Sequence, residues 1–134
     1  MNVIKTEKMK RSHTVFLLFF ISLAVFSCKY DFIKKPEPIN PEIPVSFASQ
    51  ILPIFNTGNN CTGCHKPGGE SPDLTTANAY SSIMSNELVD TASPATSLLY
   101  TFPAPTTSGH TWKKYTAEQA ELVLLWIEQG AENN

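Results

Sequence analysis

Cysteine is scarce in this sequence, and its scarcity excludes a disulfide scaffold. Only three cysteines occur in 134 residues, at positions 28, 61 and 64, whereas small secreted proteins that depend on disulfides carry several pairs. The chain also has no internal repeat, no glycine-rich phosphate loop and no strand pattern of convincing length. Nothing in it resembles a pair of catalytic carboxylates or a nucleophile with its base. We therefore expect one small globular domain that performs no substrate chemistry.

A hydrophobic run long enough to span a membrane comfortably is missing as well. The longest apolar run is TVFLLFFISLAVF, at residues 14–26, and a transmembrane helix needs about 20 such residues. Four basic residues precede this run: Lys5, Lys8, Lys10 and Arg11. A basic segment followed by a short apolar one is typical of a secretory signal peptide, which we assign to residues 1–27.

The end of the apolar run, LAVFSC, resembles the lipobox of bacterial lipoproteins, in which cleavage leaves the cysteine as an acylated N-terminus. On this interpretation Cys28 is lipidated and anchors the protein to a membrane of the bacterial envelope, facing the periplasm. The alternative is an uncleaved signal anchor with an incidental cysteine. The shortness of the run and the position of Cys28 favour cleavage.

Positive charge is scarce after the signal peptide. Residues 28–134 hold six basic and eleven acidic side chains, a net charge of −5. We do not expect nucleic acid as a partner, because its phosphates require cations. A protein partner with a basic or polar surface suits this charge better.

Prolines mark the segment after the predicted anchor. Residues 29–44, KYDFIKKPEPINPEIP, contain four prolines and no helical or alternating periodicity. We therefore expect residues 28–44 to form a lipid-anchored and largely extended tether. The folded domain is then residues 45–134.

Helical periodicity is clearest at the two ends of this domain. Phe47, Ile51 and Phe55 recur every four residues, which predicts a first helix that ends near residue 56 or 58 and is kinked or shortened at Pro53. The last helix is predicted to begin at a capping box formed by Thr116 and Gln119 and to end at Gly130. Its apolar stripe consists of Ala120, Val123, Leu124 and Ile127.

Two short helices are expected between these ends, within residues 75–85 and from Ser93 onwards, where Pro94 would occupy the first helical position. The domain is therefore predicted to be all-α, with four to five short helices. Several of them are too short to be stable without tertiary contacts.

The pentapeptide Cys61-Thr62-Gly63-Cys64-His65 carries the chemistry. Cys-x-x-Cys-His is the attachment motif of c-type haem, in which the two thiols bond to one haem edge and the histidine ligates the iron. Cys61 and Cys64 are thus predicted to bind one haem c covalently, with His65 as the proximal iron ligand. Export also brings the chain to the compartment where bacteria attach haem.

Two other interpretations of this motif fit the sequence less well. A structural zinc site needs four ligands, and beyond the motif the chain after residue 27 offers only His110 as a further histidine or cysteine besides Cys28. A thioredoxin-like dithiol is expected at the start of a helix in a βαβ unit, whereas no strand pattern precedes Cys61.

The domain resembles the small monohaem c-type cytochromes found in bacterial lipoproteins and multi-domain haem proteins. The resemblance is carried by SFASQILPIFNTGNNCTGCH, SPDLTTANAYSSIM, SPATSLLY and AELVLLWIEQGAENN. It implies a cytochrome c fold, with the first and last helices packed across each other and haem between them and the middle helices. By this resemblance Phe47 and Ile51 would contact Trp126 or its neighbours.

The sixth iron ligand departs from the commonest pattern of that family, a methionine in the loop before the last helix. Here that loop reads APTTSGHTWKKYT and contains His110 but no methionine. We predict His110 as the distal ligand, with Met84 as the alternative. Lys113, Lys114 or an open position complete the possibilities.

The predicted function is electron transfer between a redox protein donor and acceptor by a membrane-tethered cytochrome. The alternative is a haem-based gas sensor or peroxidase-like protein, whose distal position is open or displaceable. The flexible Ser108-Gly109 pair beside His110 is the feature that favours this alternative.

Overall fold

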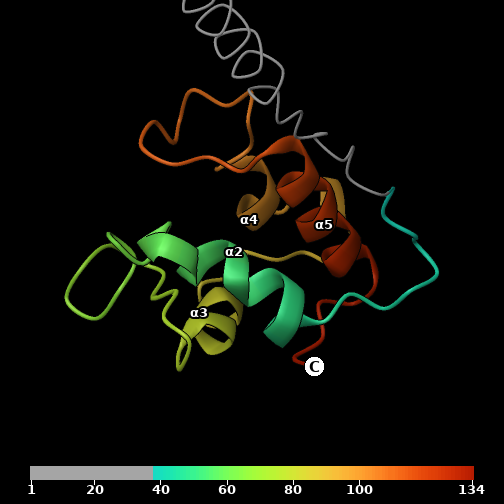
Figure 1. Ribbon diagram of the computed structural model, residues 1–134, viewed down its shortest axis with the longest axis horizontal. Helices are drawn as coiled ribbons and strands as arrows, with labels where there is room; N and C mark the ends of the chain where they lie inside the picture. Colours follow the sequence, from blue (N-terminus) through green and yellow to red (C-terminus); the bar gives the residue numbers. More distant parts are fainter. Residues whose placement is uncertain (1–37) are drawn as a thin grey trace, which may run out of the picture. The chain divides into compact units, whose positions relative to one another are not determined.

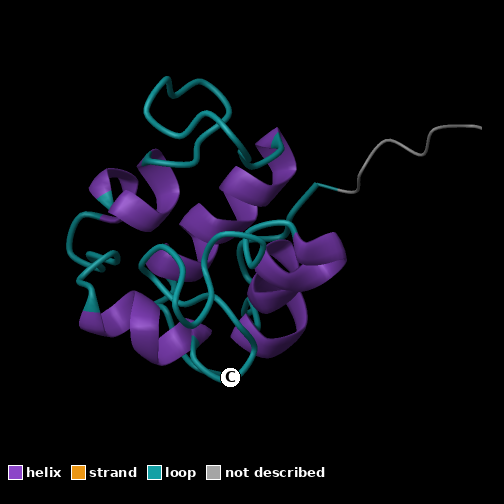
Figure 2. Cartoon of the chain, turned by 90° about the vertical axis from the view of Figure 1, so that its left-hand side faces the viewer, coloured by secondary structure: helices purple, strands orange, loops and turns teal. Residues whose placement is uncertain are grey.

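The structure, a computed structural model, describes residues 38–134, in which short helices are joined by long loops and no strand is found (Figure 1 and Figure 2). The predicted signal peptide, Cys28 and most of the predicted tether lie outside the described residues. No helix of residues 38–134 is long and apolar enough to cross a membrane. The helices, in chain order, are η1 (Phe47–Ile51), α2 (Leu52–Asn56), η2 (Thr57–Asn59), α3 (Ala79–Ser85), η3 (Pro94–Thr96), α4 (Leu98–Thr101) and α5 (Ala117–Glu128).

Pro53 changes the type of the first helix. The backbone forms a π-helical turn over η1, in which the amide of Leu52 donates to the carbonyl of Phe47, and continues as α-helix in α2. Pro53 lies in the first turn of α2, where the missing amide hydrogen of proline costs least. The sequence predicted a helix that is kinked or shortened at Pro53. Instead the helix continues, and its hydrogen-bonding pattern changes from π-helical to α-helical one residue earlier.

The capping of α5 is as predicted. The Thr116 side chain accepts from the amide of Gln119, and the Gln119 side chain accepts in return from the amide of Thr116. Gly130 has a φ of 101° just beyond the helix, a conformation that suits glycine at a C-terminal stop. The buried side chains of α5 are Ala120, Val123, Trp126 and Ile127.

Three aromatic side chains join the first helix, α3 and the last helix. The ring of Phe47 lies 5.2 Å from that of Tyr80 and 5.3 Å from that of Trp126, measured between centroids. Such tilted and edge-on aromatic pairs stabilise a core beyond the area that they bury. The predicted contact between Phe47 and Trp126 is thus present, and Trp126 is 1% exposed.

The end of the predicted tether lies against α5. Gln129 donates to the carbonyls of Pro41 and Ile43, and its side-chain oxygen accepts from the amide of Val45. Residues 41–44 are therefore part of the domain surface, and a free tether would end before them.

The helical content of residues 38–134 is compatible with the predicted all-α class. The cytochrome c fold stays a prediction.

Candidate functional site

The Cys-x-x-Cys-His segment forms one helical turn. The amide of His65 donates to the carbonyl of Cys61 at 2.9 Å, and the amide of Cys64 donates to the same carbonyl at 3.1 Å. Residues four apart on such a turn share a face, so Cys61 and His65 point to the same side and both line a cavity. Cys64 is exposed and does not line it.

Gly69 lets the following loop fold back onto this turn. The amide of Glu70 donates to the Cys64 carbonyl at 3.0 Å. A Cβ atom on residue 69 would lie 2.2 Å from that same carbonyl oxygen, a separation that no side chain tolerates. The close approach therefore requires glycine at position 69.

His65 is oriented by the backbone that returns from this loop. Its Nδ1 atom lies 3.1 Å from the carbonyl oxygen of Pro72, and since a carbonyl only accepts, Nδ1 carries the proton and donates. The amide of Leu74 donates to the His65 carbonyl at 3.0 Å. Nε2 is left as the nitrogen with a free lone pair, which is the usual state of a metal-binding histidine whose other nitrogen donates to a carbonyl.

Asp73 fixes the segment that supplies the Pro72 carbonyl. Its carboxylate accepts from the amide and the hydroxyl of Thr75, at 3.0 and 2.7 Å, and from the side-chain amide of Asn78 at 2.6 Å. The amide of Asp73 donates to the hydroxyl of Ser82 on α3. The hydrogen bonds from Thr75 hold the pKa of Asp73 below its ordinary value.

His110 reaches the cavity on a loop that is closed at its base. The amide of Tyr115 donates to the carbonyl of Pro103 at 2.9 Å, and the buried hydroxyl of Tyr115 donates to the carbonyl of Leu99 at 3.0 Å. Burial raises the pKa of Tyr115 far above its ordinary value, so the hydroxyl stays protonated and can keep donating. The His110 ring meets the Phe102 ring edge-on, with centroids 5.6 Å apart.

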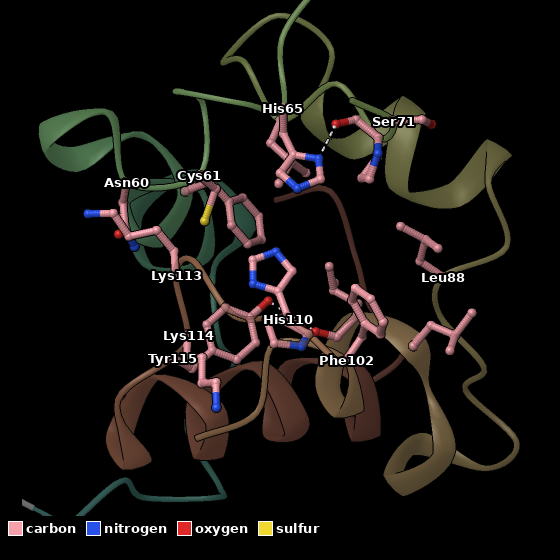
Figure 3. Close-up of a pocket in the computed structure, with 16 residues that line it drawn as sticks. Asn60, Cys61, His65, Ser71, Leu88, Phe102, His110, Lys113, Lys114 and Tyr115 are labelled. Carbon is pink, nitrogen blue, oxygen red and sulfur yellow. Dashed lines mark hydrogen bonds between the residues drawn. The ribbon is translucent and has the colours of Figure 1, made fainter. Parts of the chain in front are cut away.

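The two imidazoles face each other across the cavity (Figure 3). Their centroids are 6.1 Å apart and their planes differ by 18°. Figure 3 shows a ring nitrogen of each on the side nearest the other. Two metal–nitrogen bonds of roughly 2.0–2.1 Å on opposite sides of one ion, with roughly 1.1 Å from each nitrogen to its ring centre, would separate the centroids by about 6.2–6.4 Å. The observed 6.1 Å is slightly below this range, so the spacing of the rings is compatible with a single ion between them.

The cavity that contains these rings has a volume of about 330 Å³, within the usual range of cofactor sites. Most of its lining is apolar and comes from α2, the loop after the Cys-x-x-Cys-His turn, and α4, including Phe55, Leu74, Leu98, Leu99 and Phe102. No carboxylate lines it. Leu98 and Phe102 line the cavity and are 54% and 51% exposed, so part of its apolar lining is open to solvent.

The ligand set suits an ion that already has in-plane ligands. Within residues 38–134, no three side chains among His, Cys, Asp and Glu gather as a metal site. Zinc held by protein alone requires three or four such ligands, whereas haem iron requires only axial ones. The two facing imidazoles therefore fit haem iron better than a bare ion.

The remaining predicted residues divide into two groups. Met84, on α3, is 39% exposed and does not line the cavity, so the structure brings His110 rather than Met84 to His65. Lys113 and Lys114 do line the cavity. Burial raises the pKa of the Cys61 thiol, and the charge of Lys113 offsets part of that effect.

Comparison of the chain with protein-family models, with curated proteins and with solved structures gave no match. The chemistry of the site therefore rests on its own residues. Sequence reasoning missed Pro72, whose carbonyl accepts from His65, and Phe102, whose ring contacts that of His110. The proline of SPDL was visible, but only the folded loop shows that its carbonyl faces His65.

Proposed function

We propose that this protein is a monohaem c-type cytochrome that transfers single electrons in the bacterial envelope. One haem c would be attached through Cys61 and Cys64, with His65 and His110 as axial ligands. The lipid anchor at Cys28 would keep the protein at the membrane, where it exchanges electrons with a redox protein donor and acceptor.

The observation that carries the proposal is the pair of near-parallel imidazoles 6.1 Å apart, one of which belongs to the Cys-x-x-Cys-His turn. A haem held there would supply one-electron exchange between ferric and ferrous iron. His65 presents Nε2 with a free lone pair in a fixed orientation, since Nδ1 donates a hydrogen bond to the Pro72 carbonyl. The mostly apolar lining of the cavity supports retention of a large apolar group.

Attachment through both thiols requires a change at Cys64. The Cys61 thiol already faces the cavity, whereas that of Cys64 is on the exposed side of the turn. We expect the Cys64 side chain to turn inward as the thioether forms, because the turn that carries it is short and Gly63 and Lys66 beside it are exposed.

The test is to produce the full chain in a bacterium that attaches haem covalently, and to stain denaturing gels for haem. We expect haem to migrate with the protein after denaturation and boiling in detergent, and to be lost in the Cys61→Ala, Cys64→Ala double variant. The purified protein should cycle reversibly between ferric and ferrous spectra. Absence of covalent haem in the unmodified chain would overturn the proposal and favour a redox dithiol.

A further inference from the structure

The two histidines differ in what holds their rings. A carbonyl oxygen fixes the Nδ1 atom of His65. The Nδ1 atom of His110 is buried and has no hydrogen-bond partner, and no other buried side-chain nitrogen or oxygen in the described part of the chain is left in this state. No hydrogen bond therefore sets the rotation of the His110 ring at that atom.

The His110 ring is in contact with the aromatic ring of Phe102 instead. Its ring meets the His110 ring at an interplanar angle of 83°, the edge-on arrangement that aromatic quadrupoles favour. Phe102 follows directly after α4 and precedes Pro103, whose carbonyl closes the His110 loop. The ring is therefore attached to the fixed base of the loop, while His110 lies at its far part.

Gly109 completes the contact. A Cβ atom on residue 109 would lie 3.2 Å from Cε2 and 3.6 Å from Cδ2 of Phe102, so the absence of a side chain lets the loop lie against the ring. Gly109 is not among the glycines with positive φ. Glycine is therefore favoured at position 109 because of the space that it leaves for the Phe102 ring, rather than because of an unusual backbone conformation.

We propose that Phe102 is the positioning residue of the distal ligand: its ring, seated on Gly109, holds His110 in the orientation that ligates the iron. This inference rests on the proposed function. An aromatic contact holds a ligand less firmly than a hydrogen bond to a buried carbonyl would, so His110 is the ligand that a neutral external molecule displaces, and Phe102 sets how readily this happens.

The experiment measures the rate at which carbon monoxide binds to the ferrous holoprotein after rapid mixing. In a protein with two histidine ligands this rate is limited by dissociation of His110. We expect slow binding in the unmodified protein and fast binding in His110→Ala. Phe102→Ala should bind carbon monoxide roughly three to ten times faster than the unmodified protein, and Phe102→Tyr, which keeps the ring, should restore the slow rate.

Two further variants separate positioning from general loosening of the loop. Trp112→Ala removes an aromatic side chain that is 81% exposed, belongs to the same loop as His110 and does not line the cavity, and it should leave the rate within about twofold. Gly109→Ala keeps Phe102 but pushes its ring, and should speed binding as Phe102→Ala does.

The outcomes distinguish this inference from the proposed function. Unchanged rates in Phe102→Ala and Gly109→Ala, beside fast binding in His110→Ala, would overturn the role of Phe102 and leave the ligation intact. Equal acceleration in Trp112→Ala and Phe102→Ala would also overturn it. Equal rates in the unmodified protein and His110→Ala would overturn both, since His110 would then not be a ligand.

Discussion

The two sides of the cavity present the same chemical group by different means. On the proximal side, His65 belongs to a hydrogen-bonded turn, donates to Pro72, and is backed by a segment that Asp73 ties together. On the distal side, His110 belongs to a long loop and has an aromatic neighbour but no partner for Nδ1. A hydrogen bond fixes both distance and direction, whereas a ring contact tolerates rotation. His65 is therefore held by hydrogen bonds close to its own turn, whereas His110 is held by a ring contact from a loop.

The largest expected effect is on the side that carries the attachment. The Cys61→Ala, Cys64→Ala double variant should lose covalent haem and much of its helical circular dichroism, because a domain of this size has a small core to which haem adds apolar surface. His110→Ala should keep covalent haem and most of its helix content. Native helix content in the double variant without haem would show that the fold does not depend on attachment.

A substitution of the distal ligand should change the reduction potential without loss of haem. His110→Met replaces an imidazole by a thioether, which raises the potential of a c-type haem, so redox titration should give a higher midpoint than in the unmodified protein. Met84→Leu is the matched control and should leave the midpoint where it is, since Met84 does not line the cavity. A changed midpoint in Met84→Leu, with an unchanged midpoint in His110→Met, would identify Met84 rather than His110 as the distal ligand.

The support of His65 should weaken in acid. The pKa of Asp73 is lower in the folded state than its ordinary value of about 3.9, so its carboxylate stabilises the fold at higher pH, and this contribution is lost as the pH falls through the folded-state pKa. Asp73→Asn keeps an oxygen acceptor but cannot ionise, so chemical denaturation from pH 6 down to pH 2 should show a smaller loss of stability than in the unmodified protein. If stability depended on pH in the same way in both proteins, Asp73 would not be the group responsible for the loss in acid.

The smallest effect is expected where the distal loop joins α5. Thr116→Ala removes the hydroxyl that caps the helix directly after Tyr115, and should lower the free energy of unfolding by about 1 kcal/mol. Thr76→Ala, at an exposed turn position, is the control and should change stability by less than about 0.5 kcal/mol. Equal effects of the two substitutions would mean that the cap contributes nothing specific.

Much of the proximal side could be predicted from sequence because its chemistry is local. Residues four apart on one turn must share a face, so the motif alone placed Cys61 beside His65. The capping box of α5 was predictable for the same reason, since two residues three positions apart define it, Thr116 and Gln119.

The distal side could be predicted only in part. Counting candidate ligands pointed to His110, but its contact with Phe102 and the exposure of Met84 depend on how loops fold over the core. On the proximal side, the exposure of Cys64 was likewise not predicted. Tertiary contacts of this kind leave no periodic pattern in the chain. The hydrogen bonds of Gln129 to the end of the predicted tether could not be predicted for the same reason.

The central claim is that His65 and His110 ligate one haem iron with near-parallel rings. Low-temperature EPR of the ferric holoprotein tests it most directly. The 18° angle between the ring planes predicts a low-spin, rhombic signal with three resolved lines, which His110→Ala should abolish. A high-spin signal, or a sulfur-to-iron charge-transfer band in the accompanying visible spectrum, would contradict the account.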